Sequence, residues 1–306
     1  MKRLILKPKS SFSNPIQSDT LFGMLCWVLR YDKGEQTLIE FLQECQKGRA
    51  MVFSNAFPKD CLPFPLLPIR QFSPSKDIDI KSIKKKNFIK KDLLQNKINN
   101  VISQKTIKLL FEVSRSIPQE ANEPTPHNTI DRLTSSTLRR GGLFFSDERF
   151  FAENHLLDLY FQNNSILDDN TVIDYVEAIG KAGYGKDAST GKGQFIVTEK
   201  NDIEFSYSDC NAFMSLSLGI LSETDPRNGY YKLHTKYPKT GISNDKAVNE
   251  IPFKKPIAMI KEGSIFYDNP VKEIYGTIIS NIHADPRIVH NGQILAYPLT
   301  VKEDAK

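Results

Sequence analysis

The residues best suited to chemistry lie in one stretch, residues 180–195, where five glycines alternate with three lysines and two hydroxyl side chains. Glycine adopts positive φ and lets another backbone approach closely, so successive N–H groups can converge on phosphate oxygens. The lysines add the positive charge that attracts a polyanion. We therefore expect a polyanion-binding loop whose contacts come from Gly183, Tyr184, Gly185, Lys186, Ser189, Thr190, Gly191, Lys192 and Gly193.

Two other interpretations of this stretch compete with a polyanion-binding loop. A P-loop has four residues between its first glycine and the Gly-Lys-Ser/Thr end, whereas five residues separate Gly185 from Gly191, and Gly193 follows Lys192 in place of a hydroxyl residue. A nucleotide hydrolase is therefore not indicated. A solvated surface loop without a ligand remains the alternative, although the direct run into the apolar residues 195–197 argues against it.

The flanking residues show which elements must position the loop. Asp168-Asp169-Asn170 is typical of a helix start, and apolar residues recur at helical spacing between Thr171 and Ile179. After the loop, residues 195–197 predict a strand. The sequence therefore predicts a loop that connects a helix to a strand.

The first seventy residues predict a strand, two helices and a strand. Residues 1–7 have the pattern of a first strand, and Ser18 or Asp19 can cap a helix that buries a wide apolar face. A second helix is expected over residues 37–45 and a strand over 50–53. Residues 54–68 contain four prolines and predict an ordered, extended loop.

The middle of the chain predicts a long hairpin. Its two extended arms, residues 127–132 and 133–145, carry three arginines and several hydroxyls that suit contact with phosphates and bases. We expect such contacts from Arg132, Arg139 and Arg140, with pairing to nearby aspartates as the alternative for Arg132. Residues 118–126, rich in proline, predict a disordered or mobile tip.

Two further segments complete the expected organisation. Five lysines in residues 84–91 favour a solvated helix face over a binding site, and a strand is expected over residues 107–113. Most of the second half predicts strands, in the ranges 213–218, 230–234, 258–260, 264–267, 274–279 and 294–301. Basic residues recur among aromatic ones there, including Lys236 and Lys254.

Composition limits the classes of function. The 306 residues are 40% hydrophobic and 25% charged, with a net charge of +5, and no run approaches the roughly 18 apolar residues of a membrane span. The four cysteines are far apart and indicate neither a zinc site nor a disulfide framework. We expect a soluble, cytoplasmic protein without cofactor or metal, whose clustered positive charge favours a polyanionic partner.

Several motifs together resemble one protein family. They are residues 12–23 with Ser-Asp-Thr-Leu-Phe-Gly, Ser54-Asn55-Ala56-Phe57-Pro58 with Leu62-Pro63, Ile130-Asp131-Arg132 followed by Gly142-Leu143-Phe144, the glycine-rich loop, and Phe253-Lys254-Lys255-Pro256 with Gly263-Ser264. In this order they resemble the RAMP-superfamily subunit of type III-A CRISPR (Csm) effector complexes that holds the crRNA 5′ end. The resemblance covers nearly the whole chain.

This resemblance implies an α+β protein of two ferredoxin-like (RRM-like) modules, residues 1–200 and 201–306, with an insertion and a β-hairpin thumb at about residues 70–145. It implies a non-catalytic subunit in antiviral defence that binds the 5′ handle of crRNA and contacts a large polymerase-like subunit and a backbone RAMP subunit. Residues 183–194 would cradle the handle, with Ser18 and Thr20 nearby. The thumb, roughly residues 130–143, would reach towards the guide.

Two other classes of function were considered. A RAMP-type repeat endoribonuclease that processes pre-crRNA needs a general acid or base, usually histidine, near the scissile phosphate. His127 and His234 are the candidates, but neither has an evident partner in the sequence. A protein-interaction scaffold would leave the lysines and glycines of the loop without a role.

Overall fold

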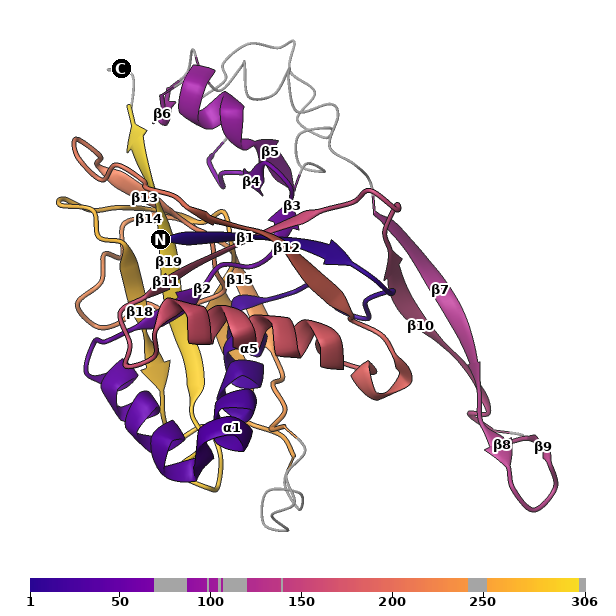
Figure 1. The fold of residues 1–306 in the computed structure, drawn as a ribbon. Helices are drawn as coiled ribbons and strands as arrows, with labels where there is room; N and C mark the ends of the chain where they lie inside the picture. Colours follow the sequence, from indigo (N-terminus) through magenta and orange to yellow (C-terminus); the bar gives the residue numbers. More distant parts are fainter. Residues whose placement is uncertain are drawn as a thin grey trace.

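The computed structural model describes residues 1–68, 87–97, 99–103, 106, 120–138, 140–241 and 252–302. The molecule is an α+β protein with two main sheets and a long arm that projects from the body (Figure 1). The α+β class expected from the sequence is confirmed. The expected strand at residues 107–113 and most of the lysine run at residues 84–91 lie outside the described residues.

The first sheet has the strand order β12-β1-β11-β2, with β3 also paired to β11. Its chain order is strand, helix, strand, followed after the arm by strand, helix, strand. The strands are β1 (Lys2–Pro8), β2 (Met51–Phe53), β3 (Phe57–Pro58), β11 (Leu157–Asn163) and β12 (Phe195–Asp202), and the helices are α1 (Ser18–Gln46) and α5 (Asp169–Ala182). All strand pairs within this sheet are antiparallel.

The two helices pack on one face of this sheet. Because successive side chains of a strand point to opposite faces, alternate residues belong to two different cores. Leu157, Leu159 and Phe161 of β11 pack with apolar residues of α1 and α5. Tyr160, between them, belongs to a core shared with the second sheet. The junction between the two main sheets is therefore apolar and extensive.

Both helices form where the sequence predicts them. Asp168 caps α5 by accepting a hydrogen bond from the Thr171 backbone N–H at 3.0 Å. The two expected N-terminal helices are continuous in α1, which kinks at Gly34 with φ 87°. Positive φ is accessible to glycine, so Gly34 lets the second half of α1 change direction.

The second sheet has the order β14-β17-β13-β19-β18, with β6 paired in parallel to β19. Its strands are β6 (Val101–Ile102), β13 (Ala212–Ser215), β14 (Gly229–Tyr230), β17 (Ile265–Tyr267), β18 (Ile274–Ile279) and β19 (His290–Val301). Two more strands, β15 (Leu233–Lys236) and β16 (Ile257–Ile260), form a separate hairpin. Among the described residues after Asp202 there is no helix, as the strand-like pattern of that half predicted.

The arm is a hairpin of β7 (Ala121–Asn128) and β10 (Leu143–Phe150), extended at its tip by β8 (Ile130–Asp131) and β9 (Ser136–Thr137). A hairpin is therefore present in this region, but its long strands are residues 121–128 and 143–150 and not the expected arms 127–132 and 133–145. The expectation of a disordered or mobile tip at residues 118–126 is wrong from residue 121 onward, because these residues form β7. Pro124 and Pro126 lie opposite Asp147 and Phe145 in the register. A two-stranded arm has two free edges, where proline's missing N–H is tolerated.

Short elements lie beside these sheets. Cys61–Pro63 (β4) pairs with Phe88–Lys90 (β5), and Leu93–Lys97 (η1) follows as one π-helical turn. Residues 54–68 thus contain β3 and β4 within the extended segment that the prolines predicted. The division at residue 200 stays a prediction.

Candidate nucleic-acid interface

The glycine-rich loop does connect a helix to a strand, and its backbone has the predicted character. It runs from the end of α5 to the start of β12, with a single 3-10 turn at Ala188–Thr190 (η2). Four of its glycines have positive φ, between 74° and 97°: Gly183, Gly185, Gly191 and Gly193. Such a backbone strongly disfavours β-branched residues at these positions.

The four glycines serve two different purposes. A Cβ on Gly183 would lie 2.5 Å from the Lys192 carbonyl oxygen, and one on Gly193 would lie 2.2 Å from that of Tyr184. These two glycines therefore close the loop on itself. Gly185 and Gly191 have nothing within 4 Å of an added Cβ, so the described part of the chain leaves the space beside them open.

The open part of the loop presents unused hydrogen-bond donors. The backbone N–H groups of residues 185–187 donate to no described residue. Gly185 and Asp187 both have positive φ, and the Lys186 side chain is 63% exposed. Successive free N–H groups in such a conformation form an anion-binding concavity. Ser189, Thr190 and Gly191 are also exposed.

The loop is braced by the segment that follows β1. Gly193 N–H donates to the Ser11 carbonyl at 2.8 Å, and Gln194 N–H donates to the Ser10 hydroxyl at 2.9 Å. The Ser13 hydroxyl donates to Asp187 at 3.0 Å. The position of the open donors is therefore fixed by residues far away in the chain.

Lys192, one of the expected phosphate contacts, is ion-paired within the chain in this structure. Its Nζ lies 2.6 Å from Oε1 of Glu148 on β10, and its side chain is only 13% exposed. The hydrogen bond from Lys192 lowers the pKa of Glu148, and one from the Ser11 hydroxyl adds to the effect. Lys192 thus joins the loop to the base of the arm. Any effect it has on a ligand would act through the loop's position.

Tyr184 and Ser18 also point inward. Tyr184 is 2% exposed, and its hydroxyl accepts from the Gln17 N–H at 2.8 Å. Its ring therefore cannot stack on a base in this conformation. Ser18 is 2% exposed, and its hydroxyl accepts from the Leu218 N–H at 3.2 Å, which links α1 to the second half of the chain.

Thr20 lies beside a buried ionic cluster that the sequence did not indicate. Lys236 Nζ lies 2.6 Å from Asp19 Oδ1 and 3.0 Å from both Thr20 Oγ1 and Gln17 Oε1. His290 Nε2 is 3.3 Å from Asp19 Oδ2. Burial opposes ionisation of Asp19, but the interactions with His290 and Lys236 outweigh it and lower its pKa to about 2.

Lys254 adds a second cation to this cluster. Burial lowers its pKa to about 8 against the attraction of Asp19, and its Nζ donates to the Val289 carbonyl at 2.6 Å. Asp19 therefore has a direct ion pair with Lys236 and a longer-range attraction to Lys254, and both lysines are partly buried. Lys236 and Lys254 were noted in the sequence as basic residues, but their partner lies more than 200 positions away, so sequence spacing carried no signal.

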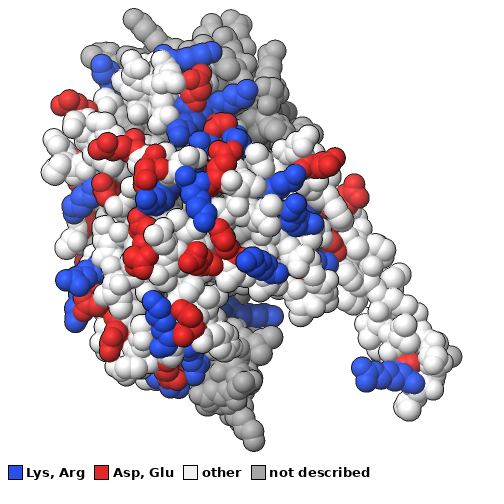
Figure 2. Space-filling view, viewed as in Figure 1, with Lys and Arg blue, Asp and Glu red and all other residues white. Residues whose placement is uncertain are grey.

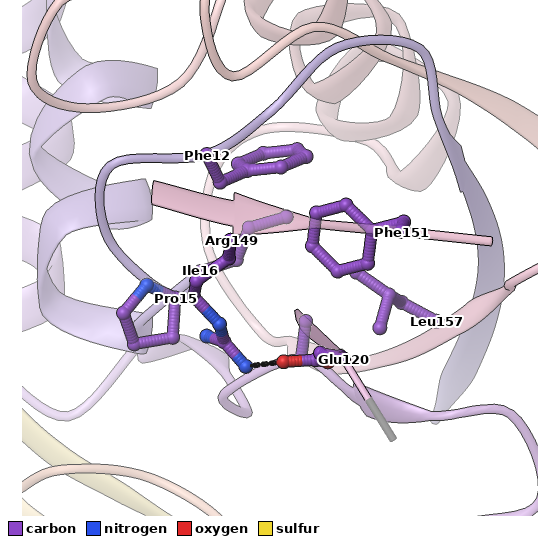
Figure 3. A pocket seen from close by; sticks show the side chains of 8 residues that line it. Phe12, Pro15, Ile16, Glu120, Arg149, Phe151 and Leu157 are labelled. Carbon is purple, nitrogen blue, oxygen red and sulfur yellow. Dashed lines mark hydrogen bonds and ion pairs between the residues drawn. The ribbon is translucent and has the colours of Figure 1, made fainter. Parts of the chain in front are cut away.

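The base of the arm is held against the body by two backbone hydrogen bonds between Phe12 and Arg149, at 3.0 and 2.9 Å. Arg149 of β10 pairs with Glu120 below Phe12 and Phe151 (Figure 3). The two rings are 5.2 Å apart and edge to face. The cavity between these side chains is only about 10 Å³, room for about one water. This site therefore anchors the arm and does not hold a ligand.

His127 on β7 lies near the same base. Its Nε2 is 2.7 Å from the Ser146 hydroxyl and 3.6 Å from Glu148, and its ring stacks on Phe144 at 5.2 Å. The histidine is thus close to Lys192 through their shared neighbour Glu148. His234, the other histidine considered for catalysis, is exposed on β15.

The tip of the arm carries two of the expected arginines. Arg132 and Arg140 are exposed, and Arg139 lies outside the described residues. Most of the arm is uncharged, and basic side chains appear at its tip (Figure 2). Large apolar side chains also project from it, including Leu133 at 96% exposure and Phe145 at 63%. Arg132 lies in the turn between β8 and β9, which Figure 1 shows at the far end of the arm from the body, and Arg140 lies between β9 and β10.

Two negative findings hold for the described part of the chain. It contains no group of three or more histidine, cysteine or carboxylate side chains placed to hold a metal ion. No helix in it is long and apolar enough to cross a membrane.

Solved structures with the same fold belong to CRISPR assemblies. A chain of the crystal structure of a Csm1-Csm4 cassette in complex with pppApA matches with a TM-score of 0.59 and 19% identity, over 100% of both chains. A chain of the crystal structure of a Csm3-Csm4 subcomplex in the type III-A CRISPR-Cas interference complex matches with a TM-score of 0.61 and 19% identity, over 98% of this chain and 100% of the other. The resemblance stated from the sequence is confirmed at the level of the fold.

Comparisons by sequence add nothing further. No protein-family model matches the chain, and no curated protein matches it.

Proposed function

We propose that this protein is the Csm4-type subunit of a type III-A CRISPR ribonucleoprotein and binds the 5′ handle of crRNA. The two kinds of assembly that contain its structural neighbours, Csm1-Csm4 and Csm3-Csm4, have Csm4 in common. By this proposal its partners are crRNA, the large Csm1-type subunit and the Csm3-type backbone subunit. A cytoplasmic location belongs to the same proposal.

The topology supports the finer fold assignment. The first sheet has two strand-helix-strand units and the antiparallel order β12-β1-β11-β2, which is the arrangement of a ferredoxin-like module. We propose that residues 1–200 form this module and that the arm is its thumb. The second module, residues 201–306, would be a β-rich relative, since its described residues hold strands and no helix.

One observation carries the RNA-binding role. The backbone N–H groups of residues 185–187 are free within the described chain, and they lie between Gly185 and Gly191, where the backbone is open to close approach. Lys186 is exposed at the same place. Recognition of single-stranded RNA relies on such loop contacts to splayed nucleotides. The sequence-predicted contacts at Lys186, Ser189, Thr190 and Gly191 therefore have accessible geometry.

The assembly role predicts what happens when the subunit is missing. A complex prepared without this chain should lose the large subunit or leave the crRNA 5′ end unprotected, because the subunit would bridge the handle and the large subunit. Native mass spectrometry and 5′-end mapping of the guide would measure both. A complex that keeps a full complement of large subunit and an intact handle would contradict the bridging role.

We also propose that the subunit is not a nuclease. Purified protein should leave labelled repeat RNA intact with or without Mg²⁺, because His127 is engaged with Ser146 and stacked on Phe144, and the carboxylate beside it, Glu148, is ion-paired with Lys192. Gel analysis of the RNA after long incubation would measure this. Cleavage that His127→Ala abolishes and His234→Ala preserves would instead establish the repeat endoribonuclease.

A further inference from the structure

A row of five residues on α1 has no role in the core. Thr20, Gly23, Trp27, Arg30 and Tyr31, which we call the α1 stripe, recur at intervals of three, four, three and one, so they follow one side of the helix. The buried residues Leu21, Leu25 and Leu29 lie on another side. The stripe extends for about 16 Å at the rise of an α-helix.

Gly23 is unexplained by the chain itself. It lies in a regular part of α1, is exposed, and has nothing within 4 Å of an added Cβ. Glycine in a helix interior makes the helix less stable than alanine does. No described residue lies close enough to Gly23 to exclude a side chain there. A partner that approaches the helix backbone at this point would require the glycine.

Trp27 and Tyr31 form an aromatic platform next to this gap. Their rings are stacked 5.8 Å apart, and the Arg30 guanidinium lies 5.4 Å from the Trp27 ring centre. Gly241 also packs against the Trp27 indole, because a Cβ added to Gly241 would lie 1.9 Å from Trp27 Nε1. Tyr31 is 73% exposed, so the platform offers an accessible ring.

The segment after β15 runs alongside the stripe and adds basic and aromatic groups. Lys236 lies 3.0 Å from Thr20 Oγ1 at one end, and Gly241 contacts Trp27 further along. Between them, Tyr237 is 70% exposed, and Lys239 Nζ lies 5.0 Å from the Phe253 ring centre. Basic groups and exposed rings thus alternate on both sides of Gly23.

We infer that the α1 stripe and the segment 236–241 form a second contact site for the same single-stranded RNA. Bases would stack on the accessible aromatic rings, the sugar-phosphate backbone would pass over Gly23, and Arg30 and Lys239 would lie near phosphates. The inference rests on the proposed RNA-binding function and extends the path of the RNA away from the glycine-rich loop. It assigns a site to residues outside the predicted contact set, apart from Thr20.

Charge and continuity favour RNA over a protein partner. Along this surface the basic groups are Arg30, Lys236 and Lys239. The acidic groups are Asp19, which is buried and paired with Lys236, Glu35, which is paired with Arg30 and Arg287, and Asp32, which accepts a hydrogen bond from the Tyr175 hydroxyl. The site is also continuous with the loop, because Gln17 bonds both Tyr184 and Lys236. Alternation of cations with exposed rings is typical of single-strand binding surfaces.

The test measures binding of a labelled single-stranded RNA of the handle sequence to the full chain by fluorescence anisotropy. Tyr31→Ala should weaken binding at least fivefold, because stacking on one aromatic side chain contributes about that much or more. Gly23→Gln, which keeps a helix-favouring residue but fills the gap, should weaken it similarly. Ile166→Ala, an exposed apolar position in the loop before α5, is the control and should bind as the parent does.

A stability measurement distinguishes whether Gly23 is required by a partner or by the chain itself. Gly23→Ala should raise the Tm by about 1 to 3 °C, since alanine favours the helix and the site is open. A lowered Tm would show that the chain itself requires the glycine and would overturn this part of the inference.

The remaining outcomes separate the inference from the proposed function. If Tyr31→Ala and Gly23→Gln bind like the parent while Lys186→Ala binds more weakly, the second site is wrong and the loop site stands. If the parent itself does not bind the RNA, the proposed function fails. If the stripe variants keep RNA affinity but no longer co-purify with the Csm1-type or Csm3-type subunit, the stripe is a protein-binding surface and the inference is overturned.

Discussion

Replacing Asp19 with alanine should lower the free energy of unfolding by about 3–5 kcal/mol, the usual effect of removing one partner from a buried ion pair. Asp19 is almost fully buried, and its carboxylate is paired with Lys236 and lies 3.3 Å from His290 Nε2. Its removal leaves the partly buried Lys236 without its ion-pair partner. Urea denaturation of the parent and the variant at pH 7 would measure the difference.

The same prediction has a pH dependence with a definite sign. The pKa of Asp19 is about 2 in the folded protein and about 3.9 in an unfolded chain. A lowered folded pKa contributes stability that is fully present above pH 4 to 5 and is lost as the pH falls towards 2. The stability gap between parent and Asp19→Ala should therefore shrink by about 2 kcal/mol across this range.

Asp169 is the matched control, because it too is an acidic residue in the first turn of its helix. Its side chain is 40% exposed, and its ion pair with Lys2 is long, at 3.7 Å. Asp169→Ala should change stability by about 1 kcal/mol at most. Equal losses for the two variants would show that the cluster around Asp19 is no more than a surface interaction.

Features encoded within short segments were predictable. The cap at Asp168, the periodicity of α5 and the strand at residues 195–202 lie within a few residues of the glycine-rich loop. Their patterns are therefore sufficient to place the loop between a helix and a strand. The helical residues of α1 and most strands of the second half were predictable for the same reason, although the sequence predicted two separate helices where α1 is one kinked helix.

Features that depend on distant partners were not predictable. Lys192 is indistinguishable from Lys186 in the sequence, yet its partner Glu148 lies 44 positions earlier on the arm. Tyr184 becomes buried because the Gln17 backbone lies beside its hydroxyl. Proline at residues 124 and 126 suggested disorder because local chemistry does not show that both residues lie on a free-edged hairpin.

Handle binding should be sensitive to Gly191, one of the two glycines of the glycine-rich loop with open space beside them. Gly191 has φ 87° and open space beside it, so Gly191→Val both strains the backbone and fills the space that a phosphate would occupy. We expect affinity to fall at least tenfold, which corresponds to about 1.4 kcal/mol. Gly48→Val is the control, since Gly48 also has positive φ and open space but lies after α1. Equal binding by the two variants would contradict the site.

Substitution of the two lysines of the loop should distinguish a direct contact with phosphate from a role in holding the loop in position. Lys186→Ala should lower the magnitude of the salt slope of binding by about 0.7, the value for one phosphate contact to a single strand, and should leave stability unchanged because its side chain is exposed. Lys192→Ala should instead destabilise the protein, because Glu148, 3% exposed, loses its cation. If Lys192→Ala also weakens RNA binding, it should change the salt slope much less than Lys186→Ala does.

If Lys192→Ala lowers the slope as much as Lys186→Ala and leaves the Tm unchanged, Lys192 contacts phosphate and its pairing with Glu148 is broken in the RNA complex. If neither variant changes the slope, the loop is a surface connector and the RNA contacts must be sought at Arg132 and Arg140 on the arm.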